Sequence, residues 1–270
     1  MDDLPGGSYP GQFSAARHGE TFFVSPTRDE ALARVQFLVA QHHPCGLLVG
    51  EAGMGKSWLL SVLADACRRQ GMDVARVNLT GVAANEFPLL LAAQLTSLSL
   101  GNLQPLQAWR AVEQRFAENH YAKRSTLITL DDADQGEPAV WEQVLRLVHS
   151  GGGRPTGLTV VCASQGGAGE RIPVEFRRLA TLRIELPPWQ LAETRDFLAH
   201  RLAAEPGERR WLDPAAVTRI HAAAAGNPQR ILQLAELAVL VATSQDAAHV
   251  DPVVVSQAEA EWSLAGLAGG

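Results

Sequence analysis

The sequence has few cysteines, almost no lysine and no long hydrophobic run, and each shortage excludes a class of protein. Its three cysteines, Cys45, Cys67 and Cys162, form no closely spaced pair, which argues against a disulfide-stapled secreted domain. No uninterrupted apolar run reaches the roughly 18 residues of a membrane span. The N-terminus is acidic and rich in glycine and proline, without the apolar segment of a secretory signal. We therefore expect a cytoplasmic protein with free, buried thiols.

Positive charge is also scarce. The net charge of -6 argues against a chain that coats nucleic acid or an anionic membrane through bulk charge. The 270 residues are 46% hydrophobic, so the chain can bury a large core in one large domain or two smaller ones.

Short apolar runs alternate with helical patterns over the first two thirds of the chain. The runs predict strands at 45–50, 74–79, 127–130, 158–164 and 181–186. One helix is predicted to begin after an N-cap at Ser25 or Thr27. Further helices are predicted at 56–70, 85–98, 103–121, 138–149 and 174–179. This alternation indicates an α/β fold with a doubly wound, mostly parallel sheet.

The pattern changes after Pro187 and Pro188, where only helices are predicted, at 191–204, 214–225, 228–243 and 252–262. We therefore expect four segments. They are a flexible leader at 1–20, an α/β nucleotide-binding domain at 21–188, a smaller all-helical domain at 189–262 and a flexible tail at 263–270.

The stretch GEAGMGKS, residues 50–57, fits the phosphate-loop pattern G-x-x-x-x-G-K-[ST] and lies between a predicted strand and a predicted helix. Its glycines allow successive backbone N–H groups to point at a polyphosphate at a helix N-terminus. Lys56 would reach the β- and γ-phosphates, and the Ser57 hydroxyl would bind Mg²⁺. Only two of the 23 basic Lys and Arg residues are lysines, so a glycine turn with an incidental lysine is a poor alternative.

The stretch TLITLDDADQ, residues 126–135, runs from an apolar strand into a cluster of carboxylates. In a phosphate-loop protein, an acid at the end of a second apolar strand holds Mg²⁺, and the next acid can orient the attacking water. We therefore assign Asp131 to the metal and Asp132 to the water. The alternative is a solvated strand end without chemistry.

GEAGMGKS, LITLDD and the later GNPQR segment together resemble the AAA+ P-loop ATPases. The segment FFVSPTRDEALARVQFLV is similar to the entry segment of the ExeA, or general secretion pathway protein A, ATPases, which are related to ATPases that assist transposition. The resemblance covers about residues 22–262.

The resemblance implies a five-stranded parallel sheet in the order 5-1-4-3-2, followed by a helical lid, with ATP or ADP and Mg²⁺ as ligands. The implied nucleotide-binding residues are Gly50, Glu51, Ala52, Gly53, Met54, Gly55, Lys56, Ser57, Trp58 and, in the lid, Arg230. Ser164 at the tip of the fourth strand would sense the γ-phosphate, with Gln165 as the alternative.

The resemblance also implies assembly. Arg177 and Arg178 resemble the arginine finger that one subunit supplies to its neighbour, which makes hydrolysis depend on a homo-oligomer. The alternative is that both arginines are merely solvated on a short helix.

Two positions depart from the family pattern. Relatives mostly have Glu where this chain has Asp132, which is one methylene shorter, and a misplacement of about 1 Å can lower the rate on the order of 100-fold. We therefore expect slow hydrolysis. Gln229 stands where the lid motif usually has arginine, and Arg230 follows about 100° further around the helix.

These features favour a Mg²⁺-dependent ATPase that acts on a protein partner, as the ExeA ATPases do. The alternatives are a nucleotide-dependent switch with little or no hydrolysis, a DNA-associated regulator of the transposition type, and a small-molecule kinase. DNA binding ranks below protein binding because residues 189–262 hold six Arg against ten Asp and Glu. Kinases usually insert their lid between strands, whereas here the extra helices follow the sheet. The membrane span and wall-binding domain of the secretion ATPases are not predicted in this chain.

Overall fold

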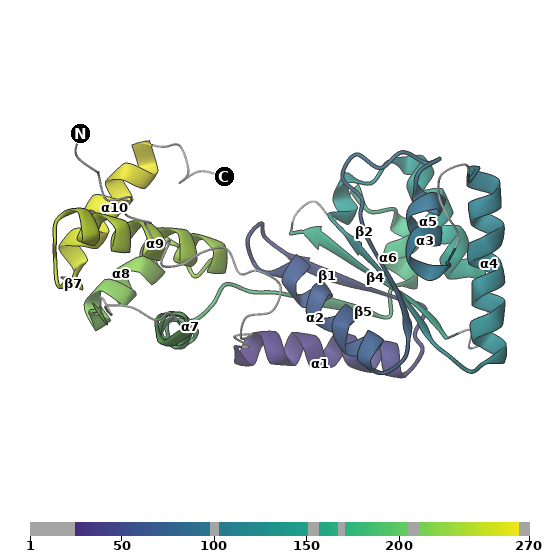
Figure 1. Cartoon of the computed structure of the whole chain (residues 1–270), viewed down its shortest axis with the longest axis horizontal. Helices are drawn as coiled ribbons and strands as arrows, with labels where there is room; N and C mark the ends of the chain where they lie inside the picture. Colours follow the sequence, from purple (N-terminus) through teal and green to yellow (C-terminus); the bar gives the residue numbers. More distant parts are fainter. Residues whose placement is uncertain (1–24, 98–102, 151–156, 167–170, 205–210, 265–270) are drawn as a thin grey trace, which may run out of the picture. The chain divides into compact units, whose positions relative to one another are not determined.

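The computed structural model describes residues 25–97, 103–150, 157–166, 171–204 and 211–264, which lie in two compact units (Figure 1). The sheet unit spans Thr27–Pro187, and the helical unit begins at Pro188. The division falls between the two prolines at which the strand-and-helix pattern of the sequence ends. The predicted leader, and the predicted tail from residue 265 onward, lie outside the described residues.

A five-stranded parallel sheet forms the centre of the sheet unit. Its strands are β1 (Cys45–Gly50), β2 (Asp73–Asn78), β3 (Thr126–Asp131), β4 (Leu158–Gln165) and β5 (Leu182–Glu185). The order is β2-β3-β4-β1-β5, and every neighbouring pair is parallel. This is the predicted order 5-1-4-3-2 read from the opposite edge, so the predicted fold is confirmed. All five carboxyl ends therefore lie at one edge of the sheet.

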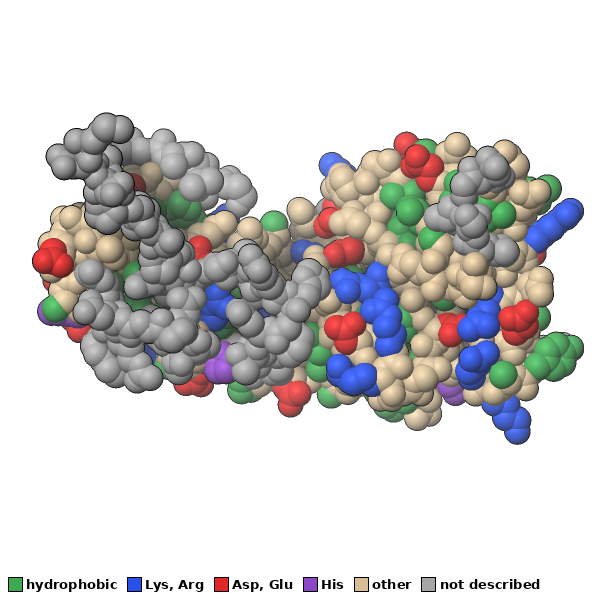
Figure 2. All heavy atoms as spheres, in the orientation of Figure 1, with side chains coloured by type: hydrophobic (Ala, Val, Ile, Leu, Met, Phe, Trp, Pro, Cys, Tyr) green, Lys and Arg blue, Asp and Glu red, His purple; other side chains and the backbone are tan. Residues whose placement is uncertain are grey.

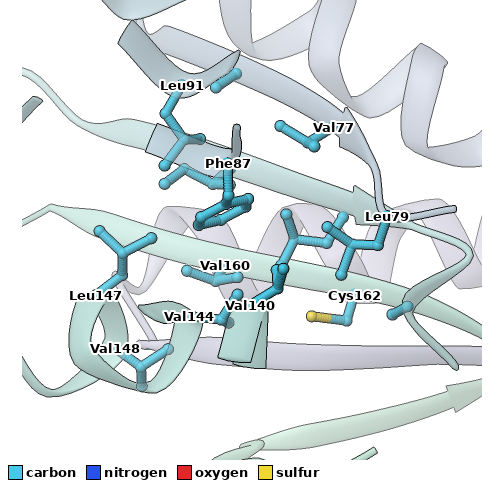
Figure 3. Packing of buried hydrophobic residues seen from close by; sticks show 14 of the residues in the cluster. Val77, Leu79, Phe87, Leu91, Val140, Val144, Leu147, Val148, Val160 and Cys162 are labelled. Carbon is cyan, nitrogen blue, oxygen red and sulfur yellow. The ribbon is translucent and has the colours of Figure 1, made fainter. Parts of the chain in front are cut away.

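Helices cover both faces of the sheet. One face packs against α3 (Phe87–Leu95), α4 (Pro105–Tyr121), α5 (Pro138–Ser150) and α6 (Val174–Leu179). Figure 3 shows part of this cluster, with Phe87 of α3 and Val144 of α5 near Val160 of β4. The other face packs against α1 (Pro26–Ala40) and α2 (Lys56–Arg69). Burial on both faces explains why the strands read as continuous apolar runs.

Local chemistry fixes where the helices begin. Proline stands at the first position of α1, α4 and α5, and of three helices in the helical unit, where its fixed φ suits the first turn and its missing N–H costs nothing. At the start of α4, Gln104 and Gln107 form a capping box.

The outer edge of β2 is covered by a side chain. The Oε1 atom of Gln94, on α3, accepts a hydrogen bond of 2.8 Å from the Arg76 backbone N–H, and its Nε2 donates one of 2.7 Å to the Arg76 carbonyl. One amide side chain thus occupies both outward-facing backbone groups of this edge residue.

The helical unit contains α7 (Leu191–Ala204), α8 (Pro214–Ala223), α9 (Pro228–Ser244) and α10 (Pro252–Leu264) around a core that includes Ile220, Leu234 and Val255. It also contains a small parallel sheet, β6 (Trp211–Leu212) with β7 (His249–Val250), where the sequence predicts helices and loops alone. Two-residue strands are too short to show a periodicity, which is why the sequence gives no sign of them.

Candidate functional site

The turn between β1 and α2 has the backbone of a phosphate cradle. Gly53 (φ 79°) and Gly55 (φ 85°) adopt left-handed conformations that glycine accepts without strain. A Cβ atom on Gly50 would lie 3.2 Å from the Leu186 Cβ and carbonyl oxygen, so the turn is packed closely there. Met54 is buried in the core and anchors the turn. Gly55 occupies the N-cap of α2, so no cap side chain covers the amides of the first turn.

Lys56 lies within this turn and is only 7% exposed. Its Nζ donates hydrogen bonds of 2.8 Å to the Gly50 carbonyl and 2.9 Å to the Glu51 carbonyl. Burial lowers the pKa of the ammonium, and the nearby carboxylates of Asp131, Asp132 and Asp134 counteract this. The structure therefore gathers one buried ammonium and three acids at the carboxyl edge of the sheet.

Asp131 is the last residue of β3, and Asp132 follows in a left-handed conformation (φ 46°, ψ 44°). The Asp131 Oδ1 accepts from the Asp132 N–H at 3.1 Å. The Asp132 Oδ2 accepts a hydrogen bond of 2.8 Å from Nδ2 of Asn78, the last residue of β2, whose Oδ1 accepts from the Thr80 N–H at 2.8 Å. The left-handed turn and Asn78 hold the Asp132 side chain in one direction.

Asp134 belongs to the same edge, although the sequence reasoning assigned it no role. It lies in a 3₁₀ turn, Ala133–Gln135, and is 5% exposed. Its Oδ1 accepts a hydrogen bond of 3.0 Å from the Gln165 backbone N–H at the tip of β4, and its Oδ2 accepts one of 2.9 Å from Gln135. The available signal was a third acid three residues after Asp131. Asp134 ties the tip of β4 to the acids after β3.

Ser164 and Gln165, the two predicted sensors, both lie at this tip, paired with Val49 and Gly50 of β1. The Ser164 side chain is fully buried, and its Oγ has no hydrogen-bond partner among the described residues. Strand alternation puts Ser164 on the face of Cys162, whereas Gln165 shares the face of α2 and is exposed. Gln165 therefore lies on the face of the sheet that carries α2, and the choice between the two residues as sensor stays a prediction.

Arg28 is a further residue that the sequence reasoning missed. It lies in the first turn of α1, is 2% exposed, and its Nε is 3.8 Å from where a Cβ on Gly55 would be. Its charge contributes to the lowered pKa of Lys56. The cradle is thus bordered by a second buried cation, which favours an anionic ligand.

The remaining predicted residues occupy varied positions. Ser57 is exposed in the first turn of α2, and Trp58, next to it, is half-buried. Arg177 and Arg178 are exposed on α6. Arg230 lies in the first turn of α9 in the helical unit, where its N–H and that of Gln229 donate to the Asn227 cap. The roles predicted for these residues stay predictions.

Within the described residues, no three His, Cys, Asp or Glu side chains lie close enough together to hold a metal ion by themselves. Among the described helices, none has both the length and the apolar character needed to cross a membrane.

Comparison with solved structures shows which proteins share this architecture. The Orc1 protein of Aeropyrum pernix, solved in complex with DNA, matches over 88% of this chain with a TM-score of 0.65 and 20% identity. Cdc6p of Pyrobaculum aerophilum matches over 91% with a TM-score of 0.68 and 14% identity. The RuvB Holliday junction branch migration motor of Thermotoga maritima matches over 88% with a TM-score of 0.61 and 16% identity.

The chain spans 66% of the length of the Orc1 protein and 69% of that of each of the other two. No match was found among curated proteins. Residues 39–171, which run from the end of α1 past the tip of β4, match the family model described as an AAA domain. This match, the sheet order and the phosphate cradle agree with one another, and the chain has the P-loop AAA+ fold.

Proposed function

We propose that this protein binds ATP with Mg²⁺ and hydrolyses it to ADP and phosphate. The proposal rests on one observation: Lys56, the backbone cradle around it and the acids after β3 lie together at one edge of the sheet. A buried ammonium in a turn of left-handed glycines is suited to a polyphosphate.

The residues divide the work as follows. Lys56, with the amides that begin α2, holds the phosphates, and Arg28 adds positive charge beside them. Ser57 and Asp131 would be the protein ligands of Mg²⁺, which when bound neutralises charge on the phosphate oxygens. Asp132 accepts the proton of the attacking water, and Asn78 orients Asp132. Asp134 positions Gln165 through its backbone N–H.

Lys56→Ala tests nucleotide binding, and the chain supplies a matched control because it has only one other lysine, Lys123. We expect Lys56→Ala to weaken Mg²⁺-dependent binding of a fluorescent ATP analogue at least 100-fold, while Lys123→Ala leaves it within twofold. Equal binding by wild type and Lys56→Ala would refute the proposed site.

The proposed role of hydrolysis is to drive assembly and action on a protein partner, as in the ExeA-like ATPases that the sequence resembles. Supply of Arg177 and Arg178 to a neighbouring subunit would complete each site, and their exposure on α6 supports this arrangement. The lid would contribute Arg230, or Gln229, to the bound nucleotide.

A nucleotide-dependent switch is the second candidate, and Asp132 favours it. Its side chain is short and its Oδ2 is already held by Asn78, so nucleotide binding can occur with slow hydrolysis.

A DNA-associated role draws support from the Orc1 fold, solved with DNA, and is opposed by the acidic balance of residues 189–262. Binding of a 30-base-pair duplex at varied salt, with and without ATP, separates that role from protein binding.

A further inference from the structure

A cavity of about 350 Å³ opens in the sheet unit at the edge opposite the phosphate cradle. It lies where α1, α2 and α4 end and where β2 and β3 begin (Figure 1). Because β1 ends at the cradle, the length of the sheet separates this cavity from the proposed nucleotide site. Nothing in the proposed ATPase chemistry uses it.

The three helices end here in the same way. At each end, the residue in the left-handed conformation lines the cavity: His42 (φ 54°) after α1, Gly71 (φ 79°) after α2 and Lys123 (φ 52°) after α4. Glycine is the usual residue at such a position, and another residue costs about 1–2 kcal/mol. Two of the three positions therefore carry a side chain that can be cationic in place of the unstrained glycine.

Those side chains are not needed to satisfy the helix ends. The last carbonyls already accept backbone hydrogen bonds, from His43 to Leu38 at 3.0 Å, from Met72 to Cys67 at 3.1 Å and from Arg124 to Asn119 at 2.8 Å. The Lys123 and Arg124 side chains at the rim are therefore available for another anion, whereas the His42 Nδ1 lies 3.4 Å from the Ser125 Oγ.

The cavity is cationic in a protein that is acidic as a whole. Among the described residues that line it, Lys123, Arg124 and His42 are basic and none is acidic, whereas the chain has a net charge of -6. The charge of Arg124 acts on Asp73, whose carboxylate is already bound by Arg115 at 2.6 and 3.2 Å and by Asn119 at 2.7 Å. Figure 2 shows basic side chains, with acidic ones among them, around the lower end of α4.

Part of the lining is apolar. Val39 and Ala40 from α1, Met72 before β2 and Cys67 contribute to it, and the neutral polar residues of the lining are Gln36, Gln70 and Ser125. Burial raises the pKa of the Cys67 thiol to about 11, so it adds no negative charge at neutral pH. This lining suits a ligand with both an apolar part and an anionic part.

We propose that this cavity binds an acidic segment of a partner protein, with an aliphatic side chain against Val39 and Met72 and a carboxylate paired with Lys123 and Arg124. The cavity has two adjacent basic residues, Lys123 and Arg124, beside apolar lining residues, whereas nucleic acids bind through several phosphates along an extended basic track. Its charge and its apolar lining complement a peptide in which leucine and glutamate alternate.

The test uses two labelled peptides, LELELE and its neutral counterpart LQLQLQ, with the full chain in the absence of nucleotide. We expect the acidic peptide to bind more tightly, with an affinity that falls as salt rises. The double variant Lys123→Gln, Arg124→Gln should weaken it at least tenfold. Arg110→Gln, an exposed cation of α4 outside the cavity, should leave it within twofold.

Ala40→Glu provides an independent variant, because Ala40 is exposed and the new carboxylate would repel the peptide without removing a contact of the fold. Binding should persist in Lys56→Ala, so this proposal can fail separately from the proposed ATPase. Equal binding of both peptides, or equal loss in Arg110→Gln, would overturn it. Tighter binding of a dT12 oligonucleotide that depends on Lys123 and Arg124 would reassign the cavity to nucleic acid.

Discussion

The chemistry proposed for this protein depends on single residues held in unusual positions, of which Asp132 is the clearest. It is left-handed, its carboxylate is bound to Asn78, and it is one methylene shorter than the glutamate of the resembled family. Because the side chain is short, its carboxylate can act as a base only if it is oriented toward the attacking water.

Two substitutions of Asp132 test the length and the charge of its side chain separately. We expect Asp132→Glu to raise the rate of phosphate release about tenfold and Asp132→Asn to lower it on the order of 100-fold, because only the carboxylates accept the proton of water. Nucleotide affinity should stay within threefold in both variants. Wild-type turnover by Asp132→Asn would remove Asp132 from the mechanism.

Asp73 gives a pH-dependent prediction. Burial would raise the pKa of its carboxyl, but hydrogen bonds from Arg115 and Asn119 and the charges of Arg115 and Arg124 outweigh this and lower it. Its contribution to stability is therefore complete above its unfolded pKa of about 3.9 and is lost as pH falls through the lower folded pKa.

Asp73→Asn should lower the free energy of unfolding by about 1–3 kcal/mol at pH 7, because it removes a charged hydrogen-bond acceptor. The difference from wild type should shrink below about pH 4, as measured by urea unfolding. Glu142→Gln, an exposed acid on α5, serves as the control and should change little at either pH. A pH-independent loss in Asp73→Asn would argue for packing instead of charge.

At the scale of elements, the sequence predicted most of the sheet unit because burial leaves an apolar pattern in the residues, which is continuous in these strands and periodic in the helices. The runs 45–50 and 158–164 lie on strands buried on both faces, Gly71 follows the end of α2, and prolines begin six of the described helices. The parallel order came from the family resemblance, since no local pattern specifies which strands are neighbours.

Contacts between distant residues were not predictable in the same way. Asp134 and Gln165 are 31 residues apart, and Arg28 reaches Gly55 from another helix. An isolated Asp or Arg reads as solvated unless a partner is known, so these members of the site required coordinates.

The turn between α8 and α9 allows a prediction at this scale. Gly226 has φ 71°, and a Cβ there would lie 2.5 Å from the Trp189 carbonyl oxygen, while its own carbonyl accepts from the Trp189 N–H at 2.8 Å. Gly226→Ala should destabilise the helical unit by about 2–4 kcal/mol through backbone strain and overpacking. Gly81→Ala (φ 69°), which meets no atom within 4 Å, should cost about 1 kcal/mol in thermal unfolding. Equal losses of stability in Gly226→Ala and Gly81→Ala would show that the close contact with the Trp189 carbonyl does not add to the cost.

At the scale of the whole molecule, the proposed sharing of sites between subunits makes turnover depend on assembly. Turnover per subunit should rise with protein concentration and should fall at least 100-fold when Arg177 and Arg178 are both replaced by alanine. Mixing that double variant with Lys56→Ala should restore part of the activity, because each supplies what the other lacks. No recovery on mixing, with assembly intact by light scattering, would place the arginines outside the reaction.

The amide of Gln94 has a consequence for how copies of this protein can meet. A flat outer strand is normally a template on which further strands from other molecules can stack, the first step toward fibrils. With Arg76 already engaged on both of its outward groups, lateral growth of the sheet at β2 is blocked in the middle of the strand. Association of copies by adding a strand beside β2 is therefore disfavoured, so the assembly proposed above would have to use other surfaces.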